Sequence, residues 1–281
     1  MFVIGAHQPV AEFHTGLLAK VWALNNIFSD EDVKIWVVHD LDSMEEEGSM
    51  SIHVPTIKGL ISIPLYSQVK RNMHKLFITK CEYLGVKRVT EVVISWLQPS
   101  SRLVKEIRSR AEILDEKFPP GEVVVAVRNT EMLLFLLEHL GVPKPDQVLY
   151  LSELLLEKKE ELKQLLYQFG PEQFWERDGD TRKPLSSSTN LLELVEEGRL
   201  IPKAVPLSAL LRLMVGREGV LIRGMGQADY EKNHPDLPPV RKAPVVTSFQ
   251  AFQLREVGVR PSALVMYLLG VKFDPHCVVW K

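Results

Sequence analysis

The fold is decided by two stretches, FVIGAHQPVAEFHTGLLAKVWAL at residues 2–24 and VKIWVVHDLD at residues 33–42. The first stretch begins with a short apolar run that ends at Gly5, which is typical of a buried strand. Its second half repeats apolar residues at helical spacing, and Thr15 stands where the N-cap of that helix is expected. The second stretch begins with a β-branched and aromatic run that suits a central strand. Together the two stretches predict a β-α-β unit.

Further elements alternate along the chain in the same way. Strands are predicted at 52–54, 91–97, 123–127, 220–222 and 278–280, and helices at 67–83, 101–118, 130–140, 152–169, 206–215 and 262–269. Strands that alternate with helices favour a parallel sheet connected by crossover helices. The sequence therefore predicts an α/β fold, with a mainly parallel sheet and helices on both faces.

A polar segment divides the chain. It runs from Gly170 to Asn190 and contains DGDTRKPLSSSTN, which is typical of a loop or hinge. The expected organisation is a core at 1–150, a small mostly helical insertion with the hinge at 151–190, and a C-terminal part at 191–281 that completes the core.

Composition disfavours several classes of protein. Of 281 residues, 46% are apolar and 25% are charged, as in ordinary globular proteins. Lys and Arg total 34 against 36 Asp and Glu, and the net charge of −2 disfavours a general affinity for nucleic acid. No run approaches the ~18 apolar residues of a membrane span. The N-terminus lacks the charged region of a signal peptide, and Cys81 and Cys277 form no disulfide framework, so a cytoplasmic protein is expected.

The loops after the first two strands are the first places to look for a site. They read GAHQP at 5–9 and HDLDS at 39–43. Right-handed crossovers bring the carboxyl ends of parallel strands to one edge of a sheet, where ligands usually bind. Both loops are therefore expected to face the same crevice.

The first loop leads into a helix that is expected to bind an anion. Backbone N–H groups near Thr15 and Gly16 would hold a phosphate, with His7 and His14 as additional donors. The alternative is that Gly5 only closes the strand and that both histidines are surface residues.

Two other junctions carry polar or flexible residues. Asp40 and Asp42 are expected to hold Mg²⁺, or to act as a general base or bind an amine; the alternative is a capped loop with solvated charges. Gly224 and Gly226 follow an apolar strand and allow a ligand to approach the backbone closely, with Tyr230 orienting it. The alternative for these glycines is a tight turn.

The three junctions together resemble one enzyme family. VIGAHQPVAEFHTGLLAKVWAL at 3–24, KIWVVHDLDSMEE at 34–46 and LIPKAVPLSALLRLMVGREGVLIRGMGQADYE at 200–231 are similar to segments of the bacillithiol-biosynthesis cysteine-adding enzyme family. The resemblance implies a Rossmann-like core related to nucleotidyltransferases. It also implies ligase-type chemistry, in which a carboxyl group is joined to an amine with activation by ATP.

The resemblance also implies a set of site residues. Those that match the family's segments are Gly5, His7, Gln8, Thr15, Gly16, Lys20, Asp40, Asp42, Arg212, Gly224, Gly226 and Tyr230. The chain departs from the family at Leu41, where the family has a histidine, and at Gln227, where it has a glycine.

Two hypotheses follow. The first is a ligase or nucleotidyltransferase-type enzyme that binds a nucleotide or another phosphorylated small molecule, with His7, His14, Asp40 and Asp42 as the catalytic groups. The second is a catalytically inactive relative that binds small molecules or acts as a scaffold. The second hypothesis predicts binding without turnover, and a homodimer formed through the helix at 152–169.

Overall fold

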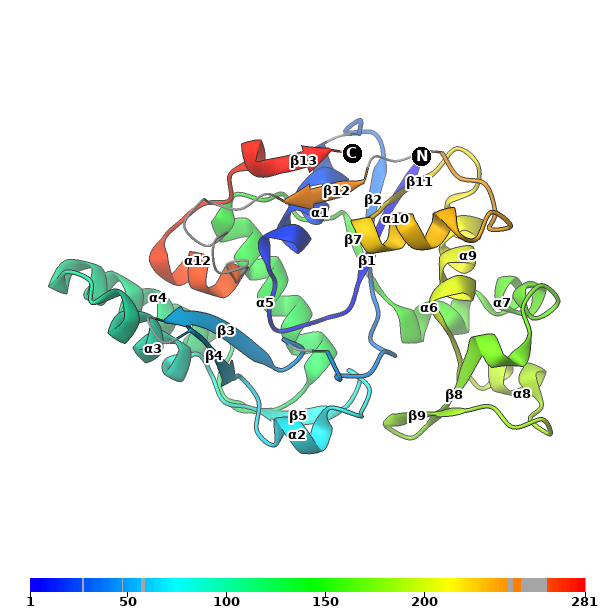
Figure 1. Ribbon diagram of the computed structural model, residues 1–281, viewed down its shortest axis with the longest axis horizontal. Helices are drawn as coiled ribbons and strands as arrows, with labels where there is room; N and C mark the ends of the chain where they lie inside the picture. The colour runs from blue at the N-terminus through cyan, green and yellow to red at the C-terminus, as the bar shows by residue number, and fades with distance from the viewer. Residues whose placement is uncertain (27, 47, 57–58, 242–244, 249–261, 281) are drawn as a thin grey trace.

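The computed structural model describes residues 1–281 except 27, 47, 57–58, 242–244, 249–261 and 281. Its centre is a parallel sheet of four strands (Figure 1). The strands are β1 (Phe2–His7), β2 (Val33–Val38), β7 (Gln147–Tyr150) and β11 (Val220–Ile222), in the order β11-β1-β2-β7. The prediction of an α/β protein with a parallel sheet is confirmed.

Alternating side chains of the sheet enter two separate cores. Val3 and Trp36 point to the first core, whereas their chain neighbours Ile4 and Ile35 point to the second. The first core contains α1 (Thr15–Asn26), α5 (Val125–Leu140) and α12 (Ala263–Leu269); the second contains α6 (Leu151–Glu157), α7 (Lys159–Leu166) and α9 (Ala204–Val215). Since strands buried on both faces need apolar residues at successive positions, this arrangement explains the continuous run at β2.

The strand order creates a crevice next to β1. From β1 the chain moves through α1 on the first face to β2 and on to β7, and it returns through α9 on the second face to β11 on the other side of β1. The connection that follows β1 and the connection that leads into β11 therefore lie on opposite faces of the sheet. Such a switch point opens a crevice at the carboxyl ends of the strands.

The segment between β7 and β11 contains a second, antiparallel sheet. It consists of β8 (Phe174–Asp178), β9 (Thr181–Pro184) and β10 (Leu200–Pro202), next to α8 (Leu191–Glu196). The loop predicted from Gly170 to Asn190 is therefore wrong in part, because β8 and β9 form a hairpin there. The helix predicted at 152–169 is two helices, α6 and α7, which meet at Lys158.

Three other predictions in the first half are wrong. The segment 67–83 contains only the short α2 (Val69–Asn72) and then β5 (Lys80–Tyr83), and 91–97 belongs to α3 (Lys87–Leu97). The run VVVAV at 123–127 ends β6 (Gly121–Val124), which pairs with β5 outside the central sheet, and starts α5. Short apolar runs fit a strand or a buried helix equally well, and here the surrounding packing decides.

The remaining elements agree with prediction or extend it. They are β3 (Ser51–Thr56), β4 (Gly59–Pro64), α4 (Ser101–Lys117), α10 (Met225–Lys232), β12 (Val246–Ser248) and β13 (Val278–Trp280), with single 3-10 turns at Pro171–Gln173 and Pro275–Cys277. Within the described part of the chain, no helix is both long enough and apolar enough to cross a bilayer.

Candidate functional site

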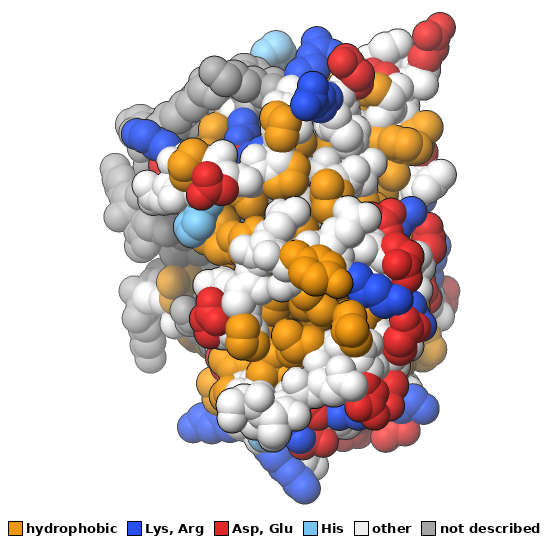
Figure 2. Space-filling view, turned by 90° about the vertical axis from the view of Figure 1, so that its right-hand side faces the viewer, with side chains coloured by type: hydrophobic (Ala, Val, Ile, Leu, Met, Phe, Trp, Pro, Cys, Tyr) orange, Lys and Arg blue, Asp and Glu red, His pale blue; other side chains and the backbone are white. Residues whose placement is uncertain are grey.

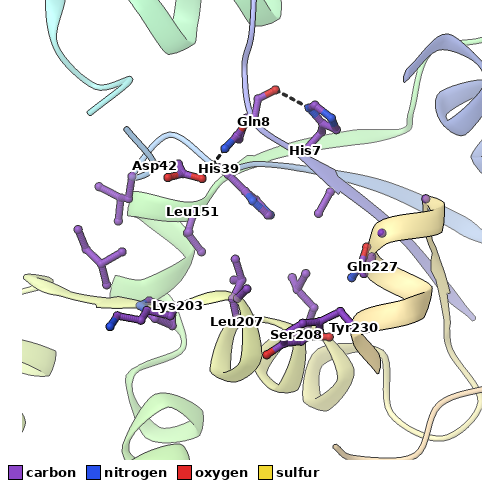
Figure 3. A pocket seen from close by; sticks show the side chains of 18 of the residues that line it. His7, Gln8, His39, Asp42, Leu151, Lys203, Leu207, Ser208, Gln227 and Tyr230 are labelled. Atoms are coloured by element: carbon purple, nitrogen blue, oxygen red, sulfur yellow. Dashed lines mark hydrogen bonds between the residues drawn. The ribbon is translucent and has the colours of Figure 1, made fainter. Parts of the chain in front are cut away.

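A pocket of about 710 Å³ lies at the switch point of the central sheet (Figure 3). Its floor comes from the carboxyl ends of the four strands: His7 ends β1, His39 follows β2, Leu151 follows β7 and Gly224 follows β11. The β8–β9 hairpin and helices α9 and α10 form the walls. The volume is within the range of ordinary small-molecule sites.

The pocket gathers about half of the residues expected from the sequence. His7, Gln8, Lys20, Asp42, Gly224, Gly226 and Tyr230 line it, whereas Gly5, His14, Thr15, Gly16, Asp40 and Arg212 do not. Five of the six residues outside the pocket have a structural role of their own. The sixth, Thr15, is the first residue of α1.

His14 caps helix α1, which corrects the expected phosphate site there. Its Nδ1 accepts hydrogen bonds from the backbone N–H groups of Gly16 (3.0 Å) and Leu17 (3.3 Å). These N–H groups are the ones that an anion would need. Neither His14 nor Gly16 reaches the pocket, so α1 is not the helix whose first turn faces it.

Gly5 is needed for packing against Trp36. A Cβ atom at Gly5 would lie 2.8 Å from the Trp36 ring, which is closer than side chains tolerate. The close approach of β1 to its neighbour therefore explains this glycine without a ligand.

Asp40 caps helix α6. One of its carboxylate oxygens accepts a hydrogen bond from the backbone N–H of Ser152 (2.9 Å), and the other accepts one from the Ser152 hydroxyl. Burial raises the pKa of Asp40, although the bonds from Ser152 act in the opposite direction. The carboxylate is thus turned toward a helix end.

Asp42 joins the hairpin to the edge of the sheet. Its carboxylate accepts hydrogen bonds from the Gln8 side chain (2.6 Å) and from Arg182 of β9 (2.6 Å). Arg182 also bonds the Ser43 hydroxyl at 2.9 Å. Because Asp42 is neutralised by Arg182 and Asp40 points elsewhere, the acidic pair does not fit a magnesium site. In the ranges that the structure describes, no group of three or more metal-ligating side chains occurs.

Two neutral imidazoles line the pocket. Burial lowers the pKa of His7 to about 3, with a further effect of the Lys20 charge, and burial lowers the pKa of His39 to about 4. The Nδ1 of His7 lies 2.9 Å from the Gln8 carbonyl oxygen. A carbonyl can only accept, so Nδ1 carries the proton and Nε2 is an acceptor. In this tautomer the ring N–H is already bonded to Gln8, which does not fit the expected role of His7 as a phosphate donor.

Lys20 extends from α1 into the same pocket. Its Nζ donates a hydrogen bond to the main-chain oxygen of Ala6 (2.6 Å), and the residue is only 7% exposed. Burial lowers the pKa of Lys20 to about 8, although the charge of Glu231 acts in the opposite direction. The amine is therefore protonated only in part just above neutral pH.

The start of α10 faces the pocket without a side-chain cap. Gly224 is the N-cap residue, and as a glycine it has no side chain that could accept hydrogen bonds from the first turn. A Cβ atom added at Gly224 or Gly226 would meet no atom within 4 Å. The first N–H groups of a helix have no partner inside it and carry a partial positive charge. They are thus in place for a ligand anion.

Glu231 holds α10 in position from behind. Its side chain is 3% exposed and lies between Arg212 (3.0 Å) and Arg223. Arg212 also donates to the Pro238 carbonyl oxygen at 2.5 Å. Arg212 was expected to bind a ligand, but in the structure it anchors α10 to α9 through Glu231.

Three polar atoms in the pocket have no hydrogen-bond partner within the described residues. They are Nε2 of His39, Oγ of Ser208 and the hydroxyl oxygen of Tyr230, all buried. Figure 3 shows the His39 ring projecting into the open space, with Ser208 and Tyr230 on the side formed by α9 and α10. Buried polar groups are nearly always paired, so these three indicate contacts that a ligand would make.

Several pocket residues were not among the predicted site residues. Trp175 and Arg182 lie in the segment taken for a loop, and Ser208 lies on a predicted helix with no motif around it. Only His39 had a usable signal, since it directly follows a buried strand.

Comparison with known proteins adds no assignment to this geometry. The chain matches no protein-family model, and no curated protein is significantly similar to it.

Proposed function

We propose that the protein is an enzyme of the transferase or ligase type with a Rossmann-like core, and that its pocket binds a nucleotide or another phosphorylated small molecule. The observation that carries this proposal is the set of three unpaired polar atoms, on His39, Ser208 and Tyr230, in one pocket at the switch point of the sheet. Leaving buried donors unpaired costs free energy, which ligand contacts would recover.

An anionic group fits the α10 side of the pocket. The first turn of α10 supplies N–H groups that have no acceptor among the described residues, and it contains no acidic residue. The hydroxyls of Ser208 and Tyr230 can donate as well. Lys203 adds positive charge at the wall, where its Nζ lies 4.0 Å from the centre of the Trp175 ring. Such a combination suits a phosphate group or another small anion.

The remaining groups suit proton transfer next to the bound anion. His7 and His39 are neutral and offer ring nitrogens that can hydrogen-bond the reacting groups, and Lys20 exchanges a proton near neutral pH. Groups that hold and release protons without water are what a transfer reaction requires. The acidic pair takes no part in this proposal.

A second candidate is a binding or scaffolding protein without turnover. Figure 2 shows hydrophobic side chains gathered over the middle of the face that carries α7, α8 and α9. Leu156 of α6, Tyr167 directly after α7 and Leu192 of α8 are at least 49% exposed. Exposed apolar patches often mark protein contacts, which favours a homodimer through this region. Failure to release AMP, ADP or pyrophosphate from ATP, despite binding, would favour this candidate.

Calorimetry with pyrophosphate, ATP and CTP tests the proposed binding. We expect binding heat in the absence of a metal, because the anion is held by backbone and hydroxyl donors. Ser208→Ala and Tyr230→Phe should each weaken binding by about tenfold to a hundredfold, since a hydrogen bond to a charged group contributes about 1.5–3 kcal/mol. Ser208→Ala should leave the thermal stability unchanged or raise it, because it removes an unpaired buried hydroxyl.

Tyr167→Phe is the matched control. It makes the same chemical change on a residue that is 88% exposed and lies outside the pocket. Its affinity should equal that of the unmodified protein. Absence of binding heat with all three ligands, or equal affinities of Tyr230→Phe and Tyr167→Phe, would rule out the proposed site.

A further inference from the structure

The amine of Lys20 is buried in the pocket without a carboxylate partner. Its Nζ donates a hydrogen bond to the main-chain oxygen of Ala6 and lies 5.9 Å from the centre of the Trp36 ring, and within the described residues no acidic oxygen lies within 4.0 Å of it. Buried lysines are rare unless they are paired, because the charged form loses its hydration. A buried amine that stays unpaired in a ligand pocket is a candidate for reaction in its neutral form.

The nearby acid does not compensate the charge of this amine. Glu231 is the carboxylate that acts on Lys20, but it already lies between Arg212 and Arg223. The two guanidinium groups hold its charge behind α10. The surroundings of Lys20 therefore shift the amine toward its neutral form, relative to an exposed lysine.

Proton carriers for a reaction at Lys20 lie in the same pocket. Nε2 of His7 is an acceptor, Nε2 of His39 has no partner in the described structure, and the same holds for the Tyr230 hydroxyl. These groups can hydrogen-bond the attacking amine and the departing hydroxyl and so relay a proton from the nitrogen to the oxygen.

We propose that Lys20 forms an imine with a small aldehyde or ketone that carries an anionic group. The inference rests on the proposed function, since the same pocket must first bind the anion at α10. The nitrogen lone pair forms a bond to the carbonyl carbon, and a proton passes from nitrogen to oxygen. The resulting hydroxyl takes up a second proton and leaves as water, which gives the C=N bond with no oxidant or reductant.

The state of the amine supports attack near neutral pH. Burial lowers its pKa from 10.5 to about 8. At pH 7.5 about a quarter of such an amine is neutral, against about one part in a thousand for an ordinary lysine. Lower basicity also makes the amine a weaker nucleophile, so the net gain in rate over an ordinary lysine is on the order of tenfold to a hundredfold. Of the two reaction types proposed above, an imine fits a transferase, because it activates the neighbouring carbon for group transfer.

Reductive trapping on the full chain tests the inference. The protein is incubated with pyridoxal 5′-phosphate, a phosphorylated aldehyde, or with glyoxylate, an aldehyde that carries a carboxylate. Sodium borohydride then reduces any imine, and peptide mass spectrometry locates the adduct. We expect labelling of Lys20 on the order of tenfold faster or more than labelling of the exposed Lys105, and protection by pyrophosphate. The preferred aldehyde identifies the anion as phosphate or carboxylate.

Two variants and a binding measurement complete the test. Lys20→Arg should abolish the fast adduct, and Lys34→Arg should keep it, because Lys34 is equally buried (5% exposed) but lies outside the pocket. If Lys20→Arg does not fold, the inference is tested on the unmodified protein alone, by locating the adduct and by measuring whether pyrophosphate protects Lys20 from labelling. Calorimetric binding of the aldehydes or of pyrophosphate without an adduct at Lys20 would overturn the imine and leave the proposed function standing. No binding of either kind would overturn both.

Discussion

Glu231→Ala is expected to lower the free energy of unfolding by about 3–5 kcal/mol, because it leaves two guanidinium groups buried without a counter-ion. Glu231 is 3% exposed at the side chain, and its partners Arg212 and Arg223 are 10% and 15% exposed. Removing one member of a buried ion cluster costs far more than the contact itself contributes, since the remaining charges cannot regain water. Urea unfolding followed by circular dichroism measures the change.

The matched control for this variant is Glu197→Ala. Glu197 forms its ion pair with Arg199 at the surface, where the two side chains are 43% and 42% exposed. Exposed pairs contribute about 0–1 kcal/mol, so this variant should unfold almost like the unmodified protein. Equal stabilities of the two variants would show that Glu231 does not anchor α10 as described.

Lys20→Met is expected to raise the free energy of unfolding at pH 7 by about 2–3 kcal/mol. The pKa of Lys20 falls from 10.5 in the unfolded chain to about 8 in the folded protein. Below pH 8 the folded protein must therefore hold a charged amine that burial disfavours, at a cost of about 1.4 kcal/mol for each unit of the shift. Methionine fills a similar volume without the charge, and the lost bond to Ala6 offsets part of the gain. A protein that keeps such a lysine sacrifices stability at this position, which is typical of functional sites.

The pH dependence gives this expectation a second readout. Between pH 8 and 10.5 the unfolded chain binds a proton at Lys20 that the folded protein has released, so the stability of the unmodified protein rises with pH in this window. The advantage of Lys20→Met should thus shrink by about 2 kcal/mol between pH 7 and 9.5. Lys105→Met, which removes an exposed positive charge from α4, controls for the change in net charge. A constant advantage at both pH values would contradict the described environment of Lys20.

The central strands of the fold could be predicted because the local preference of their residues and their packing in the cores favour the same structure. The β-branched run at 33–38 is buried on both faces, and Gly5 ends an apolar run at a place where only glycine fits beside Trp36. The predictions of secondary structure are wrong where local preference and tertiary packing favour different structures. VVVAV at 123–127 has strand composition, yet its last three residues enter the first turn of α5, because packing against the first core outweighs local preference there.

The site could be predicted only where it follows the ends of strands. His7, Gln8, Asp42 and Gly224 were found because parallel strands direct their carboxyl ends to one edge. The walls come from α9, α10 and the hairpin. A sequence does not show which side of a helix faces the end of a distant strand, so Ser208 of α9 could not be predicted. His14 and Asp40 were assigned to chemistry because capping and catalysis use the same polar side chains. Only the hydrogen bonds to Gly16, Leu17 and Ser152 separate the two roles.

The anion site that we propose at the start of α10 can be tested directly by an anomalous-scattering experiment. Crystals soaked in selenate, which has the charge and shape of a tetrahedral oxyanion, would be measured at the selenium absorption edge. We expect the strongest bound-ion peak inside the pocket, within hydrogen-bond distance of the Gly226 and Gln227 N–H groups and of the Ser208 or Tyr230 hydroxyl. A peak beside Thr15 and Gly16 at the start of α1, or no peak in the pocket at a concentration that saturates binding in solution, would contradict the account.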